Sequence, residues 1–292
     1  MSFRLEMLQV ARLAPKLLGD SAELVSAFLH SQQRGGGFAD RKGESDLYYT
    51  VFGLEGMLAL QQKLQVDVHV DWLKQFGSGE GMDFVHLCCL ARCWAALKHA
   101  GVTEDQRAEL AARVETHAAS EGGYHVAKGR QWGSAYGCLL AAAAYEDVGL
   151  PMPRQDRVKA CMDALRSRDG GWTNEAGLPL GIAPATAAAL SLYRRMGWEM
   201  PEESVQWLKR CFVAEGGCKA MPAAPIPDLL STAVALHGLS GAQADIADLR
   251  EPCLDFVDSL WSNEGGFHGN WTDHTLDCEY TYYGLLALGH LV

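Results

Sequence analysis

Apolar residues recur at helical spacing in two alternating kinds of segment. The first kind mixes charged and apolar residues, which predicts helices buried on one face. The second kind is apolar nearly all round and rich in Ala and Gly, which predicts helices enclosed on both sides. The first kind covers residues 24–33, 70–76, 110–118, 157–168, 205–213 and 254–262, and the second covers 48–62, 84–100, 133–148, 183–196, 227–239 and 279–292. No alternating strand pattern of useful length appears.

A glycine turn separates the two helices of each pair. Its paired glycines supply positive φ, and an aromatic residue usually follows that can pack at the turn. The turns are GGGF at 35–38, EGGYH at 121–125, DGGWT at 169–173, EGGCK at 215–219 and EGGFH at 264–268, with a weaker GSGEGMD at 77–83. The first glycines of the last four pairs are 48, 46 and 49 residues apart. This period indicates helical-hairpin repeats along the whole chain.

Repeats of this kind stack as an open solenoid or close into a ring. The uniformly apolar second helices and the count of six repeats favour closure, with the second helices inside. We therefore predict an all-α fold over residues 1–292: one α6/α6 toroid, a closed α/α barrel, with a central cavity. The repeats are expected at roughly 21–62, 68–100, 107–149, 155–197, 202–241 and 251–292.

Composition limits the partners. The net charge of −11 disfavours nucleic acid, because a sequence-independent grip on phosphates needs clustered Lys and Arg. No apolar run is long enough for a transmembrane segment, and residues 1–20 predict an amphipathic helix rather than a secretory signal. The nine cysteines are an odd number, and most lie in helical apolar patterns. We expect a cytoplasmic protein with reduced thiols.

The glycine–aromatic turns and aromatic second helices, above all GGGFADRKGESDLYYT, DGGWT and EGGFHGNWTDHTLDCEYTYYGLLAL, resemble the prenyltransferase and squalene-cyclase repeat superfamily. The resemblance covers almost the whole chain. It implies an α6/α6 toroid whose cavity holds an isoprenoid diphosphate or another long apolar molecule. It is strongest to protein prenyltransferase β subunits, which pair with a helical-repeat partner subunit.

The resemblance implies a metal site at the heads of two inner helices. Protein prenyltransferases hold zinc through Asp-x-Cys and Asp-x-x-His, so that the acceptor thiol ionises. The matching residues here are Asp46 and His86, the latter in Asp83-Phe84-Val85-His86, but Tyr48 stands in the cysteine position. Zinc or magnesium at Asp46 and His86 is thus an expectation with one ligand missing. Asp46, Asp83, His86 and Asp277 are the candidate catalytic residues.

Cationic and aromatic residues are the expected substrate contacts. Family members bind diphosphate with Arg, Lys, His and Tyr at the cavity mouth. Arg41 and Tyr49 match family positions, and Trp132 stands where the family has a histidine. The full set of expected substrate contacts is Arg41, Lys42, Tyr49, Lys128, Arg130, Trp132, Tyr136, Tyr280 and Tyr283.

Each candidate has an ordinary explanation. An aspartate at a helix start is commonly an N-cap. A histidine on an apolar helix is more often a satisfied core residue than a ligand. The basic loop residues are equally typical of solvated surface charge, and the aromatic residues could fill a solid core. Against a solid core, the Ala-rich inner helices leave space.

Three functions remain open. The first is a prenyltransferase-like enzyme acting on a prenyl diphosphate. The second is a terpene cyclase whose acid differs from the Asp-x-Asp-Asp tetrad, which is absent here; a buried carboxyl with a raised pKa would serve. The third is a non-catalytic binding or scaffold toroid, which predicts a solid aromatic centre.

Overall fold

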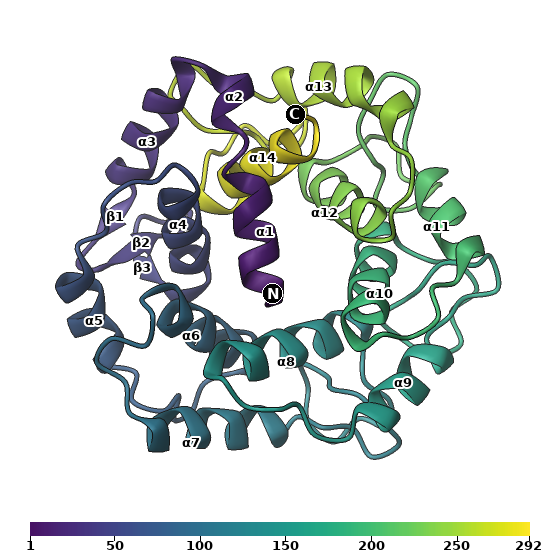
Figure 1. Ribbon diagram of the computed structural model, residues 1–292, viewed down its shortest axis with the longest axis horizontal. Helices are drawn as coiled ribbons and strands as arrows, with labels where there is room; N and C mark the ends of the chain where they lie inside the picture. The colour runs from purple at the N-terminus through teal and green to yellow at the C-terminus, as the bar shows by residue number, and fades with distance from the viewer.

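Two concentric sets of helices form a ring in the computed structural model, which describes residues 1–292 (Figure 1). The inner helices are α4 (Leu47–Ala59), α6 (Phe84–Ala96), α8 (Ala135–Val148), α10 (Ala183–Met196), α12 (Leu229–Gly241) and α14 (Cys278–His290). The outer helices are α3 (Ser21–Ser31), α5 (Val66–Lys74), α7 (Glu104–Glu115), α9 (Gln155–Ala164), α11 (Glu202–Lys209) and α13 (Arg250–Asp258). Each inner helix packs on the next, and α14 packs on α4. The predicted α6/α6 toroid is confirmed.

The glycine turns hold neighbouring repeats together by close backbone approach. Gly122 and Gly216 have φ of 154° and 94°, and a Cβ on either would lie 2.3 or 1.8 Å from a carbonyl oxygen of the next outer helix. Gly265 in the last repeat makes the same approach to α3 in the first, where its Cβ would lie 2.2 Å from the Leu24 oxygen. Only glycine fits these positions, so the turn that repeats along the chain also closes the ring.

A threonine in the first turn of several inner helices secures the glycine turn. The Thr50 hydroxyl accepts the Phe38 amide at 2.8 Å and donates to the Asp46 carbonyl. Thr186 and Thr232 repeat this arrangement with Trp172 and Cys218. The residue after each glycine pair is thereby fixed beneath an inner helix, with its backbone donor satisfied.

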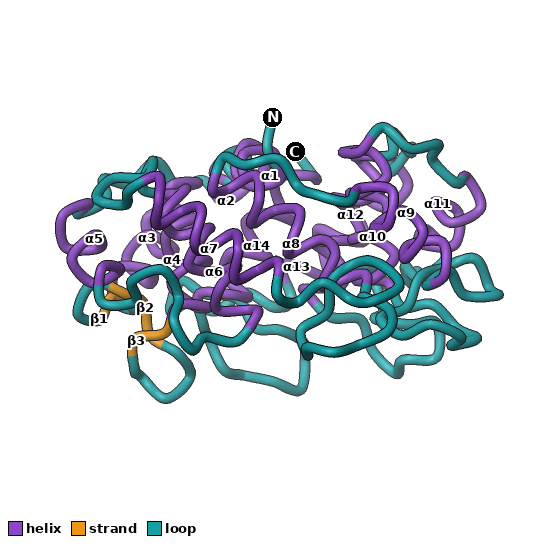
Figure 2. Tube along the Cα trace, turned by 90° about the horizontal axis from the view of Figure 1, so that it is seen from below, coloured by secondary structure: helices purple, strands orange, loops and turns teal.

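The first glycine turn also carries a small antiparallel sheet that the sequence did not predict. Its strands are β1 (Gln33–Arg34), β2 (Gly37–Ala39) and β3 (Ser45–Asp46), in the order β1-β2-β3. Strands of two or three residues are too short to leave an alternating pattern. Figure 2 shows the sheet with the glycine-turn loops, which gather at one end of the ring.

The N-terminal segment covers the other end. Helix α1 (Phe3–Ala11) crosses the ring on the side opposite the glycine-turn loops (Figures 1 and 2) and packs on α4, α8 and α14. Its Arg4 makes a buried ion pair of 2.7 Å with Glu55. Two short elements complete the chain, α2 (Pro15–Leu18) and the 3-10 helix η1 (Ala247–Leu249). None of the helices has the length and hydropathy needed to span a bilayer.

Alanine in place of Gly216 is expected to destabilise the fold by about 3 kcal/mol, since it adds overpacking to the strain of positive φ. Gly177→Ala is the matched control, because Gly177 has φ of 83° and open space around its Cβ position. It should cost only the strain, about 1–2 kcal/mol. Urea unfolding of both variants measures the difference. Equal losses would contradict the role given to close approach.

Candidate functional site

The heads of the inner helices meet at the loop end of the ring. Asp46, Asp83, Asp228 and Asp277 each cap their helix, accepting the amide three residues on with one carboxylate oxygen at 2.7–3.1 Å. Capping is therefore real, but it engages one oxygen and leaves the other for a further contact. In three of the four, that second oxygen contacts a charged or ionisable side chain.

The first such contact joins two of the predicted residues. His86 lies between two caps, with Nε2 3.3 Å from Asp46 Oδ2 and Nδ1 2.7 Å from Asp83 Oδ2. The hydrogen bond to Asp46, with a smaller contribution from Asp83, raises the pKa of His86 to about 9. The same hydrogen bond with His86 lowers the pKa of Asp46. At neutral pH His86 is therefore a protonated imidazolium that lies between two carboxylates.

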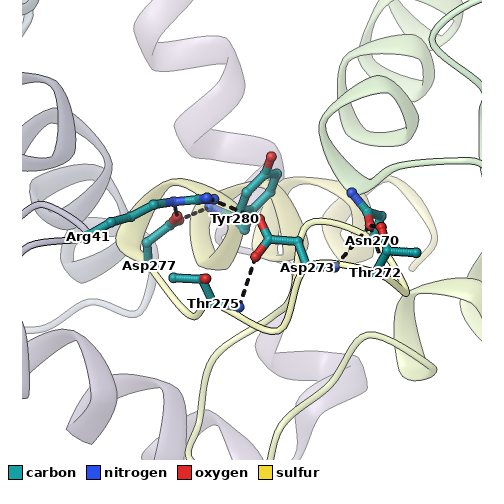
Figure 3. A network of polar contacts seen from close by, with 7 residues as sticks. All are labelled: Arg41, Asn270, Thr272, Asp273, Thr275, Asp277 and Tyr280. Carbon is teal, nitrogen blue, oxygen red and sulfur yellow. Dashed lines mark hydrogen bonds and ion pairs between the residues drawn. The ribbon is translucent and has the colours of Figure 1, made fainter.

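The second contact joins Arg41, in the loop between β2 and β3, to the head of α14 (Figure 3). Arg41 donates from Nε to Asp277 at 2.9 Å and from Nη1 to Asp273 at 3.0 Å. Its guanidinium lies 5.5 Å from the Tyr280 ring centroid, within cation–π range. Burial raises the pKa of Asp277, an effect that the bond to Arg41 opposes. Both carboxylates already compensate the Arg41 charge.

The third contact was not predicted. The Tyr48 hydroxyl donates to Glu279 Oε1 at 2.5 Å, joining the first turns of α4 and α14. Glu279 is only 9% exposed. Burial raises its pKa to about 7, although the Tyr48 bond and Arg41 both act to lower it. Glu279 therefore exists as a mixture of acid and carboxylate near neutral pH.

A cavity of about 350 Å³ runs through the ring. It begins among first-turn residues such as Tyr48, Val85 and Tyr136, and Tyr136 is exposed at the loop end. It reaches α1, whose Phe3 and Met7 also line it. Most of its lining is apolar, and its volume is in the range of small-molecule pockets. The ring is hollow, which argues against the solid aromatic centre expected of a scaffold.

The other predicted residues are distributed unevenly around this cavity. Tyr136 and Tyr283 line it, whereas Tyr49 lies near Arg41 at the mouth. Trp132 is not among the lining residues, and it packs against the core beside Gly122. The loop cations Lys42, Lys128 and Arg130 are exposed, and Arg130 lies 3.8 Å from Glu175. Their contact with a substrate remains a prediction.

The donor set does not fit the zinc site that the resemblance implies. Asp46 and His86 do meet, but Tyr48 in the cysteine position gives its hydroxyl to Glu279. A catalytic zinc takes three protein ligands. No group of three or more His, Cys, Asp or Glu side chains is arranged to hold a metal ion. All nine cysteines are buried, and burial raises the pKa of the cavity thiols Cys88 and Cys89.

The protein is a hollow α/α toroid with ionisable groups at its loop end. The family model of the prenyltransferase alpha-alpha toroid domain matches residues 6–80 and 185–291. The chain belongs to this family. Comparison with curated protein sequences gives no match.

Solved structures share the fold at low identity. Protein geranylgeranyltransferase-I of Candida albicans, complexed with GGPP, superposes with a TM-score of 0.63 at 12% identity, over 84% of this chain and 83% of that one. Type II terpene cyclase MstE from Scytonema gives 0.63 at 14% identity, over 94% and 96%. A variant of that cyclase in complex with geranylgeranyl dihydroxybenzoate also gives 0.63, at 13% identity over 98% and 97%.

The sequence did not single out Glu279, because its pKa depends on the residues that surround it in the folded ring. It stands between Asp277 and Tyr280, which both drew attention as motif positions. A usable signal was present, however. Glu279 is an acidic residue in the first turn of an otherwise apolar, enclosed helix, and a charge there needs a partner or a raised pKa.

We expect His86→Gln to flatten the dependence of stability on pH between 6.5 and 9. A histidine with a raised pKa binds its proton more tightly in the folded state, so its stabilisation is complete below 6.5 and is lost as pH rises to about 9. Urea unfolding with EDTA present would measure this at several pH values. His30→Gln, at an exposed position of α3, serves as control. An unchanged slope in His86→Gln would remove the assigned contacts.

Proposed function

We propose that the chain is an enzyme that binds an isoprenoid in the ring cavity and cyclises it by proton transfer from Glu279. Family membership and two ligand-bound neighbours of the same fold, one with GGPP and one with a geranylgeranyl substrate, support the isoprenoid. One observation carries the reaction type: a nearly buried carboxyl with a pKa of about 7, bonded to Tyr48, which lines the cavity. A general acid works best with a pKa near the operating pH.

The chemistry would begin at an alkene held beside the mouth. Protonated Glu279 gives its proton to one alkene carbon, and the π electrons form the new C–H bond. The neighbouring carbon becomes a cation, which a second double bond attacks to form a C–C bond. The reaction ends in one of two ways. A carbon next to the final cation loses a proton to the Glu279 carboxylate, and the C–H electrons form the double bond of a cyclic isomer. Alternatively, water adds to the cation and its excess proton goes to the same carboxylate, which leaves an alcohol. No oxidant or reductant is needed.

Aromatic faces suit the cationic intermediates. Tyr48, Phe52 and Tyr283 line the cavity, with ring centroids 5.1 Å apart for Tyr48–Phe52 and 5.5 Å for Phe52–Tyr283. A cation over such faces is stabilised by the ring quadrupoles, more so away from water. The cluster adjoins Glu279 through Tyr48, so the charge would form where it is best stabilised.

Prenyl transfer from a diphosphate is the second candidate. Arg41 and Tyr49 at the mouth favour it, since both could contact the leaving group. The diphosphate would have to displace Asp273 and Asp277 from Arg41. Three features stay predictions: a metal at Asp46 and His86, a partner subunit and a cytoplasmic location. Metal analysis of the purified protein tests the first. No step here is routed through a metal.

Product analysis separates the two reactions. Incubation with geranylgeraniol and, separately, with geranylgeranyl diphosphate should give a cyclic product that keeps its hydroxyl or diphosphate if Glu279 protonates the alkene. Prenyl transfer would instead release pyrophosphate and require an acceptor. Pyrophosphate release without a cyclic product would overturn the cyclase proposal.

Glu279→Gln is expected to lower the cyclisation rate by at least about 100-fold, because the amide cannot supply the proton. Asp228→Asn is the control. Asp228 is a half-buried carboxyl whose pKa burial also raises, but its second oxygen accepts from Ser231, which does not line the cavity, and asparagine still caps a helix. Equal loss in both variants, measured by product formation, would contradict a special role for Glu279.

The pH profile gives an independent check. Activity should fall as pH rises through about 7, since the acid form of Glu279 is required. Tyr48→Phe removes a hydrogen bond that lowers the pKa of Glu279, so the fall should move to higher pH. A profile that stays in place, or moves to lower pH, would separate Tyr48 from the acid.

A further inference from the structure

The inner end of the cavity carries polar groups that proton transfer at the mouth leaves unused. Arg92, Asp147, Ser191 and His237 all line the cavity. Arg92 lies eight residues beyond the first residue of α6, which places it about 12 Å further along the helix axis. Asp147 is in the last turn of α8. The polar cluster is therefore far from Glu279 and close to the end that α1 covers.

Arg92 keeps hydrogen-bond donors free within the ring. Its Nε donates to Asp147 Oδ2 at 2.5 Å, and its terminal nitrogens bond no protein atom. The guanidinium has five N–H groups, so four remain without a protein acceptor. The side chain is 17% exposed and lines the cavity, whereas that of Asp147 is 3% exposed. Donors that face a mostly apolar cavity favour an oxygen acceptor on the ligand.

The surrounding charges select a neutral acceptor over an anion. Asp147 already compensates Arg92 and itself lines the cavity. Glu55 also acts on Arg92 electrostatically, and Arg4 pairs with Glu55. His237, whose pKa burial lowers to about 4, adds no positive charge at neutral pH. An anionic group would meet the Asp147 carboxylate and no uncompensated cation, so nothing would offset the cost of its desolvation.

We propose that the inner end of the cavity is a binding site for a neutral oxygen function of the substrate, held by the terminal N–H groups of Arg92. The substrate class is then an uncharged, oxygenated isoprenoid such as an alcohol, ether or ketone. This rests on the proposed function in taking the cavity ligand to be an isoprenoid. It also sets the orientation of the bound isoprenoid. Its oxygenated end lies against α1, and its distal alkene lies beside Glu279.

Displacement of the uncharged fluorophore N-phenyl-1-naphthylamine from the full-length protein tests the site. Three competitors are compared: farnesol, farnesyl diphosphate, and a C15 hydrocarbon that differs from farnesol only in lacking the hydroxyl. We expect farnesol to bind about tenfold more tightly than the hydrocarbon, the usual effect of a hydrogen bond to a charged group. Comparing two ligands on one protein cancels general changes in the cavity.

The variant Arg92→Met/Asp147→Leu removes the ion pair as a unit and should abolish this tenfold preference. Its matched control is Arg113→Met/Glu80→Leu, which removes an ion pair on the outer side of the ring whose members do not line the cavity. The control should keep the preference. If the first variant does not fold, Arg92→Lys retains the charge but has fewer donors, and it should reduce the preference.

The outcomes separate the inference from the proposed function. Failure of every competitor to displace the fluorophore would overturn isoprenoid binding itself. Equal affinities for farnesol and the hydrocarbon in the native protein would overturn only the oxygen site. Tightest binding by farnesyl diphosphate, weakened by loss of Arg92, would show that the site takes an anion and would overturn the neutral acceptor.

Discussion

The structure depends on how closely one backbone can approach another at the glycine turns. Gly122 and Gly216 bring the turn of one repeat against a carbonyl of the next outer helix, and Gly265 does the same between the last repeat and the first. A side chain at any of these places would push the repeats apart. Because the same close backbone contact recurs between repeats, successive repeats are related by similar rotations. The last repeat therefore packs on the first through the same kind of contact, and the ring closes.

Closure has a chemical result at the mouth. Every glycine turn leads into an inner helix, so the positive ends of the inner helix dipoles converge there. Carboxylates cap several of these ends and also reach across to His86 and Arg41. Glu279 lies in the first turn of α14, two residues after the cap Asp277, where burial rather than capping governs its pKa. One end of the ring thus holds carboxyl groups at several depths, each with a different affinity for its proton.

Sequence periodicity predicted the ring because the two kinds of helix differ in how much of their surface is apolar, and burial requires that difference. The pairing of Asp46 with His86 came from the family resemblance, whose motifs these two residues match at adjacent helix heads. The sequence did not reveal Glu279 or Arg92, since each acquires its role from residues more than fifty positions away. The β1–β3 sheet was missed because strands so short carry no period.

Helix α1 covers the end of the cavity that lies away from the glycine-turn loops (Figure 2). Phe3 and Met7 form its back wall, and the ion pair of Arg4 with Glu55 fastens that wall to the ring. Tyr136, on the cavity wall, is exposed at the opposite, loop end. A flexible chain that becomes a rigid fused ring inside would be harder to withdraw than to admit. In the proposed reaction, release of the product would then be slower than bond formation.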